Sequence, residues 1–322
     1  MLLQSLFLSL VLTPFSLSTP LTKRAFSNGP AITSAFPDPA FIQVDGTYYA
    51  FATTDGKSNI PTATSPDFNT WTLTGQDALP TIPNWSTGNT WAPSVSRLAD
   101  GTFLMYFAAT TSQDTSKHCV GTATSSTVEG PYTASNTIFA CPLAQGGAID
   151  PSGFTDSDGT LYVTYKIDGN SLGGGGTCGN GDGSHSTPLM LQPVGADGVT
   201  PSGPAVQILD RDTADGPLVE APYIILVNGT YVLFFSSNCY SGPLYDTSYA
   251  TASAVRGPYT KASTPLLQSG DDGGALYSPG GASVDPAGTR MVFHADEVQG
   301  DDAVRQMWTA GIVVEGTTVR IS

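Results

Sequence analysis

The sequence predicts an all-β protein, a five-bladed β-propeller in a single domain. Helix signals are almost absent, because the 322-residue chain consists of short apolar and aromatic runs bounded by Gly, Pro, Asp, Asn and Ser. Charged residues make up 12% of the chain, too few for the solvated faces of many amphipathic helices. A unit of 55 to 70 residues recurs five times, as expected for propeller blades that stack on one another.

Each repeat contains a proline, an inner strand, a Gly-Thr turn and an alternating aromatic strand. The five copies are AFPDPAFIQVDGTYYAF, WAPSVSRLADGTFLMYFAAT, IDPSGFTDSDGTLYVTYK, EAPYIILVNGTYVLFFSS and YSPGGASVDPAGTRMVFHAD. Their turn glycines are Gly46, Gly101, Gly159, Gly229 and Gly288. The Asp-Gly and Asn-Gly pairs predict two-residue hairpins, since a type I′ turn needs positive φ. A second recurring element, at Ala63, Ala123 and Ala250, predicts an outer strand of the same unit.

The propeller is expected over residues 25–322, after an export segment. Residues 1–18 combine an apolar run with small residues near its end, as in a secretory signal, and Lys23-Arg24 could end a pro-segment at residue 24. An even number of cysteines in a secreted chain favours disulfides. Of the three possible connectivities, chain order favours Cys119–Cys141 with Cys178–Cys239. The Gly-rich insert 168–188 then reads as a rim loop pinned by Cys178.

The net charge of −15 argues against nucleic acid and anionic membranes as partners, because phosphate binding needs clustered Lys and Arg. It does not by itself indicate a cationic substrate, since acidic surfaces also keep secreted proteins soluble. No later apolar run approaches membrane length, so we expect a soluble, extracellular protein that acts as a monomer.

Functional residues are expected where the repeats differ. The inner-strand prolines are preceded by Asp38, Ala92, Asp150, Ala221 and Ser278, with Trp91 and Glu220 one position earlier. Since the innermost strands of a propeller line one axis, three carboxylates and several aromatics should meet in a single funnel. Crowded carboxylates cannot all ionise easily, which separates a proton donor from a base. Such a division of labour is the one used in glycoside hydrolysis. The structural alternative is that Asp-Pro only forms turns.

The mature chain resembles glycoside hydrolase family 43 in four motifs: Pro-Asp38-Pro, Trp91-Ala-Pro, Ile149-Asp150-Pro and Val219-Glu220-Ala-Pro-Tyr. The resemblance implies that Asp38 is the general base that activates water. It implies that Glu220 is the general acid, and that Asp150 holds and tunes this acid. It also implies inversion of the anomeric configuration.

Further site residues follow from position or from the resemblance. Trp91 offers a face for sugar stacking, with Phe36 and Tyr277 as weaker candidates of the same kind; the alternative is a core role. His294 resembles a residue that helps hold calcium or orients a carboxylate, although Ser278-Pro-Gly-Gly replaces the Gly-His pair of many members. Arg305 resembles an arginine near the axis, with a surface salt bridge as the alternative. His118 and His185 lie in loop-like sequence and receive no role.

The favoured function is an exo-acting α-L-arabinofuranosidase on arabinan, arabinoxylan or their oligosaccharides. Endo-1,5-α-L-arabinanase and β-xylosidase share the same carboxylates and stay open as alternatives. No cofactor is required, and a structural calcium ion near the axis is a further expectation of the resemblance. A sugar-binding propeller without catalysis is the rival from another class. It should repeat its ligand residues in every blade, whereas here the funnel residues differ.

Overall fold

The structure is a computed structural model that describes Phe26 and residues 29–322. The expected signal sequence at residues 1–18 and the Lys23-Arg24 pair lie outside the described residues. Within the described part of the chain, no helix is long and apolar enough to cross a membrane.

Five antiparallel sheets form the blades, and each follows chain order from its inner to its outer strand. Blades one and two contain β1 (Ala40–Val44), β2 (Thr47–Phe51), β3 (Pro61–Ser65), β4 (Thr72–Asp77), β5 (Ser86–Arg97), β6 (Phe103–Thr111), β7 (Asp114–Ser125) and β8 (Thr133–Ala134). Blade three contains β9 (Ala148–Thr155), β10 (Leu161–Ile167), β11 (Leu189–Val194) and β12 (Val206–Leu209). Blades four and five contain β13 (Val219–Val227), β14 (Thr230–Ser237), β15 (Asp246–Ala252), β16 (Thr260–Lys261), β17 (Leu267–Gln268), β18 (Gly280–Val284), β19 (Arg290–Val298), β20 (Asp301–Glu315) and β21 (Thr318–Ile321).

Helical segments are short and lie between strands. They are η1 (Leu143–Gln145), η2 (Gly169–Leu172), η3 (Thr177–Gly179) and α1 (Asp271–Gly274). The prediction of five blades is confirmed, with one addition: in blade four, β17 pairs with β15 beside β16.

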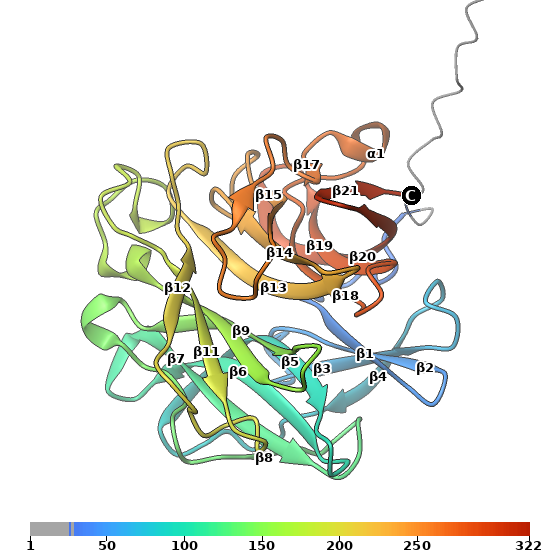
Figure 1. The fold of residues 1–322 in the computed structure, drawn as a ribbon, viewed down its shortest axis with the longest axis vertical. Helices are drawn as coiled ribbons and strands as arrows, with labels where there is room; N and C mark the ends of the chain where they lie inside the picture. The colour runs from blue at the N-terminus through green and yellow to red at the C-terminus, as the bar shows by residue number, and fades with distance from the viewer. Residues whose placement is uncertain (1–25, 27–28) are drawn as a thin grey trace, which may run out of the picture.

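The blades form a closed ring in sequence order, and the colours in Figure 1 pass around it from blue to red. Each inner strand lies against the inner strand of the next blade, and β18 returns to β1. The segment before β1 closes the ring by pairing with the last blade. The N–H groups of Ala31 and Phe36 donate to the carbonyls of Met307 and Arg305 at 2.8 and 2.9 Å. The first and last blades are therefore joined by backbone hydrogen bonds.

The hairpin turns confirm the turn prediction in two blades and correct it in two others. Asp45-Gly46 and Asn228-Gly229 have positive φ at both residues and form two-residue turns. Asp100 and Asp158 also precede glycine, but they lie in longer turns in which only the glycine has positive φ. Their carboxylates instead accept the N–H two residues ahead at 2.9 and 2.8 Å, a competing turn chemistry.

The hydrophobic core is divided among the interfaces between blades. Each cluster draws on neighbouring sheets, as where Phe51 of blade one packs with Phe107 of blade two, and Phe234 of blade four with Phe293 of blade five. No blade buries its faces alone, so the inner ends of the strands are fixed by the ring as a whole.

Both favoured disulfides are present, Cys119–Cys141 and Cys178–Cys239. The second bond joins the insert after β10 to the loop between β14 and β15. The insert therefore is pinned at the rim, as expected, and it contains η2 and η3.

Candidate active site

A recurring backbone distortion aims the inner strands into the axis. The residue before each inner-strand proline has left-handed φ, between 44° and 54°, at Asp38, Ala92, Asp150, Ala221 and Ser278. In blades two, three and four this residue and its proline form a bulge opposite a single residue of the next strand. Such bulges re-aim side chains at functional sites. The chain tolerates this conformation in two alanines, because their N–H groups are held by Thr53 Oγ1 (2.8 Å) and Asp150 Oδ2 (2.9 Å).

One cavity of about 600 Å³ collects the funnel residues. Asp38, Trp91, Asp150, Glu220 and Arg305 all line it. The spatial prediction for the three carboxylates is therefore correct.

Two side chains hold the carboxylate of Asp38. Arg305 Nη1 lies 3.2 Å from its Oδ1, and the Thr53 hydroxyl donates to its Oδ2 at 2.6 Å. Burial pushes the pKa of Asp38 upward, but Arg305 and the hydrogen bonds outweigh it and leave the pKa below its usual value. Asp38 is therefore an ionised carboxylate near neutral pH, as a base must be.

His294 supports Asp38 through the backbone. Its Nδ1 accepts the Asp38 N–H at 3.1 Å, so the ring proton is on Nε2. Burial, followed by the Arg305 charge, lowers the pKa of His294 to about 3. The 3.3 Å approach of Nδ1 to Asp38 Oδ1 is therefore not an ion pair. His294 orients the backbone that carries the carboxylate.

The described residues provide no group of side-chain ligands for the expected calcium ion. Calcium takes six to eight oxygen ligands. His294 Nε2 is buried without a partner, yet no group of three His, Cys, Asp or Glu side chains among the described residues could share an ion. Among the described residues the expected calcium ion therefore has no protein-built set of side-chain ligands, and the calcium expectation stays a prediction.

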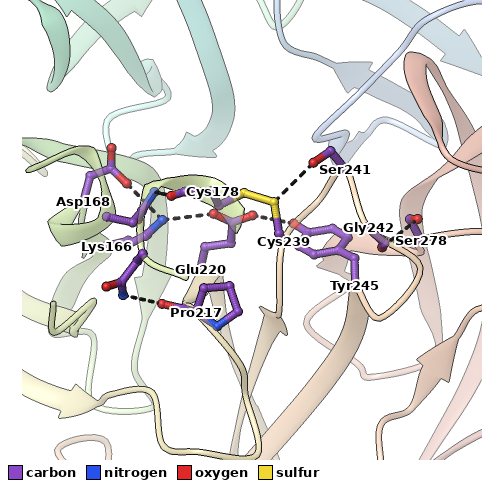
Figure 2. Close-up of a disulfide and its surroundings, with 12 residues drawn as sticks. Lys166, Asp168, Cys178, Pro217, Glu220, Cys239, Ser241, Gly242, Tyr245 and Ser278 are labelled. Atoms are coloured by element: carbon purple, nitrogen blue, oxygen red, sulfur yellow. Dashed lines mark hydrogen bonds and ion pairs between the residues drawn. A yellow bond between two sulfur atoms is a disulfide. The ribbon is translucent and has the colours of Figure 1, made fainter. Parts of the chain in front are cut away.

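Glu220 lies on β13 and has a donor at each carboxylate oxygen. Lys166 Nζ donates to Oε2 at 3.0 Å, and the Tyr245 hydroxyl donates to Oε1 at 2.7 Å (Figure 2). Lys166 is fully buried, and Asp168 forms its second ion pair at 3.0 Å. This set fixes the orientation of the proposed acid.

Asp150 differs from Asp38 in its surroundings. Burial, and then the negative charge of Glu220, raise the pKa of Asp150 well above its usual value, although Lys166 acts in the opposite direction. Its Oδ2 accepts the Ala221 N–H, so Asp150 also fixes the backbone beside Glu220. The cavity therefore contains one ionised carboxylate and one that retains its proton more strongly, a separation suited to acid–base chemistry.

Trp91 lines the cavity and stacks on His118 of β7, with ring centroids 3.5 Å apart. Burial lowers the pKa of His118 to about 4, so a neutral ring supports the indole. The hydroxyl of Thr110 lies 3.0 Å from its Nε2. The sequence-based prediction that His118 lies in a loop is wrong, because His118 occupies a buried position in β7.

Two weaker candidates do not reach the cavity. Phe36 is fully buried in a core cluster with Ile32 and Met307, so it has no surface to offer a sugar. Tyr277 is partly buried but does not line the cavity. Tyr240 and Tyr245, from the loop between β14 and β15, line the wall instead.

Sequence reasoning missed Lys166, Asp168, Thr53, Tyr240 and Tyr245. Only Lys166 carried a signal, since a lone lysine between Tyr165 and Ile167 interrupts an apolar strand and buried lysines need partners. Thr53 and Asp168 follow the second strands of their blades, the two tyrosines lie in a loop, and their approach to the axis depends on the ring.

A propeller that brings three carboxylates, two of them differently tuned, into one axial cavity has the arrangement of a glycoside-cleaving enzyme of the acid–base type. The sequence pattern described as Glycosyl hydrolases family 43 matches residues 27–312. The chain belongs to this family.

Relatives and solved structures agree with that assignment. The chain is 26% identical over 290 residues to "Extracellular endo-alpha-(1->5)-L-arabinanase 2" of Bacillus subtilis (strain 168), covering 79% of this chain and 56% of the relative. It thus spans about half the length of that relative. It is 28% identical over 290 residues to "Beta-D-galactofuranosidase xynD" of Aspergillus niger, covering 81% and 75%. The crystal structure of a thermostable family-43 glycoside hydrolase shares the fold, with a TM-score of 0.79, 24% identity and coverage of 92% and 96%.

Proposed function

We propose that this protein is a secreted, exo-acting α-L-arabinofuranosidase that inverts the anomeric configuration. Its substrates would be arabinan, arabinoxylan or their oligosaccharides. In this reaction Asp38 takes a proton from a water molecule as the water oxygen bonds to the anomeric carbon. Glu220 gives its proton to the glycosidic oxygen as the bond from that oxygen to the anomeric carbon breaks. This single displacement releases one sugar and the shortened alcohol.

The observation that carries the exo assignment is the covalently joined rim. Cys178 from the insert and Tyr240 and Ser241 from the loop between β14 and β15 all line the cavity. The Cys178–Cys239 bond joins these two segments beside Glu220. Because a disulfide fixes this wall, the cavity favours binding of the end of a polysaccharide over binding of an internal stretch. Arg305 lies beneath Tyr240, with its guanidinium carbon 5.2 Å from the ring centroid, so the wall also packs on the Asp38 partner.

An endo-1,5-α-L-arabinanase is the second candidate, and the name of the Bacillus subtilis relative favours it. The Aspergillus niger relative is named for another furanoside, which supports a five-membered sugar ring in either case. Export is supported by the signal-like residues 1–18 and by the two disulfides.

Product analysis separates the candidates. The purified protein would be incubated with linear 1,5-α-L-arabino-oligosaccharides labelled at the reducing end. The proposal predicts free arabinose from the first time point, with labelled products shortened by one unit at a time. Labelled products of scattered length would indicate the endo enzyme, and cleavage confined to aryl β-D-xylosides would indicate a xylosidase. Binding of oligosaccharides without any cleavage would indicate a sugar-binding propeller that has no catalytic activity.

A further inference from the structure

Lys166 is a buried charge for which the acid–base pair alone gives no reason. Its side chain has no exposed surface, and its Nζ lies 3.0 Å from both Asp168 Oδ1 and Glu220 Oε2. Figure 2 shows the ammonium group between the two carboxylates, which come from different blades. Burying a lysine is costly unless it is paired, so this position is a specified feature of the site.

The two contacts of Lys166 are unequal. The lysine donates a hydrogen bond to Glu220. Its contact with Asp168 is an ion pair without a well-directed hydrogen bond, because Asp168 Oδ1 accepts none. Burial opposes the charge of Lys166, but Asp168 and then Glu220 more than compensate and raise its pKa. Lys166 is therefore a permanent cation in the working pH range.

Other groups also act on Glu220. Tyr245 stays a neutral donor, because burial and the charge of Glu220 raise its pKa. The remaining charged or titratable groups that interact with Glu220 or with its lysine are Asp150, Asp168, Tyr240 and Arg305. Lys166 and Tyr245 both donate to the Glu220 carboxylate, whereas an acid catalyst must carry a proton before it can give it. The site therefore needs an opposing charge.

We propose that Lys166 and Asp168 form a counter-ion pair that controls how readily Glu220 takes up the proton it donates. Lys166 favours the ionised form, and Asp168 weakens that effect by drawing the ammonium charge towards itself. Both are positioning residues that act through Glu220. The inference rests on the proposed acid role of Glu220, but the direct test below does not need a substrate.

The test uses the small number of glutamates in the chain. There are four, Glu129, Glu220, Glu297 and Glu315, so selective ¹³C labelling of the side-chain carboxyl gives four signals. The Glu220→Gln variant lacks the Glu220 signal and thereby assigns it. The titration midpoint of this signal would be measured by NMR in the full protein, in Lys166→Met and in Asp168→Asn. Lys57→Met removes the same charge at an exposed position and is the control.

The proposal predicts shifts of opposite sign. Lys166→Met should move the midpoint to higher pH by about one unit, because an opposite charge at this distance is lost. Asp168→Asn should move it to lower pH, because the ammonium then acts on Glu220 alone. Lys57→Met should leave it within about 0.2 units, as expected for a screened surface charge.

The same signs should appear in catalysis. The alkaline limb of kcat/KM against pH, where the acid loses its proton, should follow each midpoint. An unmoved midpoint in folded Lys166→Met, or shifts of equal sign in both variants, would overturn the proposal. Asp168→Asn is nearly isosteric and keeps the test decisive if Lys166→Met does not fold. An inactive wild type whose midpoints still shift as predicted would refute only the proposed function.

Discussion

At the scale of single residues, the site depends on giving similar carboxylates different partners. Asp38 has a cation and a hydroxyl donor, and its pKa falls below the usual value. Asp150 is buried beside another carboxylate, and its pKa rises. Neither property belongs to the residue type, because the partners Arg305 and Glu220 arrive from other parts of the chain.

Glu220→Gln tests the proposed acid with two leaving groups. Cleavage of arabino-oligosaccharides, whose leaving alcohol needs a proton, should fall by about 10²–10⁴-fold. Cleavage of a 2,4-dinitrophenyl arabinofuranoside should fall far less, since its leaving group departs without protonation. The exposed variant Glu129→Gln should change neither rate. Equal losses on both substrates would contradict the acid role.

Arg305→Met tests the electrostatic support of the base. Arg305 lowers the pKa of Asp38, so its removal should raise that pKa. The base must be ionised, and the acidic limb of kcat/KM against pH should therefore move to higher pH, by about one unit. The surface arginine Arg320, changed to Met in the same way, should leave the limb in place. If the acidic limb of Arg305→Met lies at the same pH as in the wild type, Asp38 is not the group that titrates in that limb.

The three carboxylates could be found from sequence because they occupy one aligned position, or the position beside it, in three repeats. Their partners could not. Thr53 and Tyr245 reach Asp38 and Glu220 from later segments of the same blade, and Asp168 acts on Glu220 only through Lys166. Phe36 illustrates the opposite error: it lies two residues before Asp38, yet it points into the core.

At the scale of elements, the strands were predictable and the loops only in part. Alternating apolar runs located the inner and second strands of all five blades. Local carboxylate–backbone bonds lengthened the turns at Asp100 and Asp158 despite their glycines. The insert 168–188 was recognised as a rim loop, but its contribution to the cavity wall depends on where Cys239 meets it.

Removing the rim disulfide should change product size as well as stability. The variant Cys178→Ser with Cys239→Ser frees two segments 61 residues apart and should lose about 2–4 kcal/mol of unfolding free energy. Its looser wall should also admit internal bonds, so that labelled products shortened by several units at once appear from the first time points. Loss of Cys119–Cys141 should lower stability without that change. Identical product patterns in both variants would argue against the rim as the determinant of exo action.

At the scale of the whole molecule, the site exists only when the ring is closed. The closing segment pairs with β20 immediately before Asp38, and its Phe36 N–H binds the carbonyl of Arg305. Base and partner arginine are thus brought together by the same seam that joins the first and last blades. The recurrence of the repeat predicted the ring, whereas the sequence contained no signal for which segment closes it.

Ile32→Ala tests this seam. Ile32 is buried against Met307, and its truncation should cost about 2–5 kcal/mol in urea unfolding. Activity should fall together with the fraction of folded protein, since Asp38 directly follows the closing segment. Ile138→Ala, at a half-buried position outside the seam, should cost less. A cost at Ile32 no larger than at Ile138 would show that the seam contributes little.

The most direct test of the account is the anomeric configuration of the first sugar released. Proton NMR would follow the early hydrolysis of an aryl α-L-arabinofuranoside by the wild-type protein. If Asp38 activates water opposite the leaving group protonated by Glu220, β-L-arabinofuranose should appear first and then equilibrate. Initial release of the α-anomer would show that the configuration is retained. Asp38 would then not be the base of a single displacement by water.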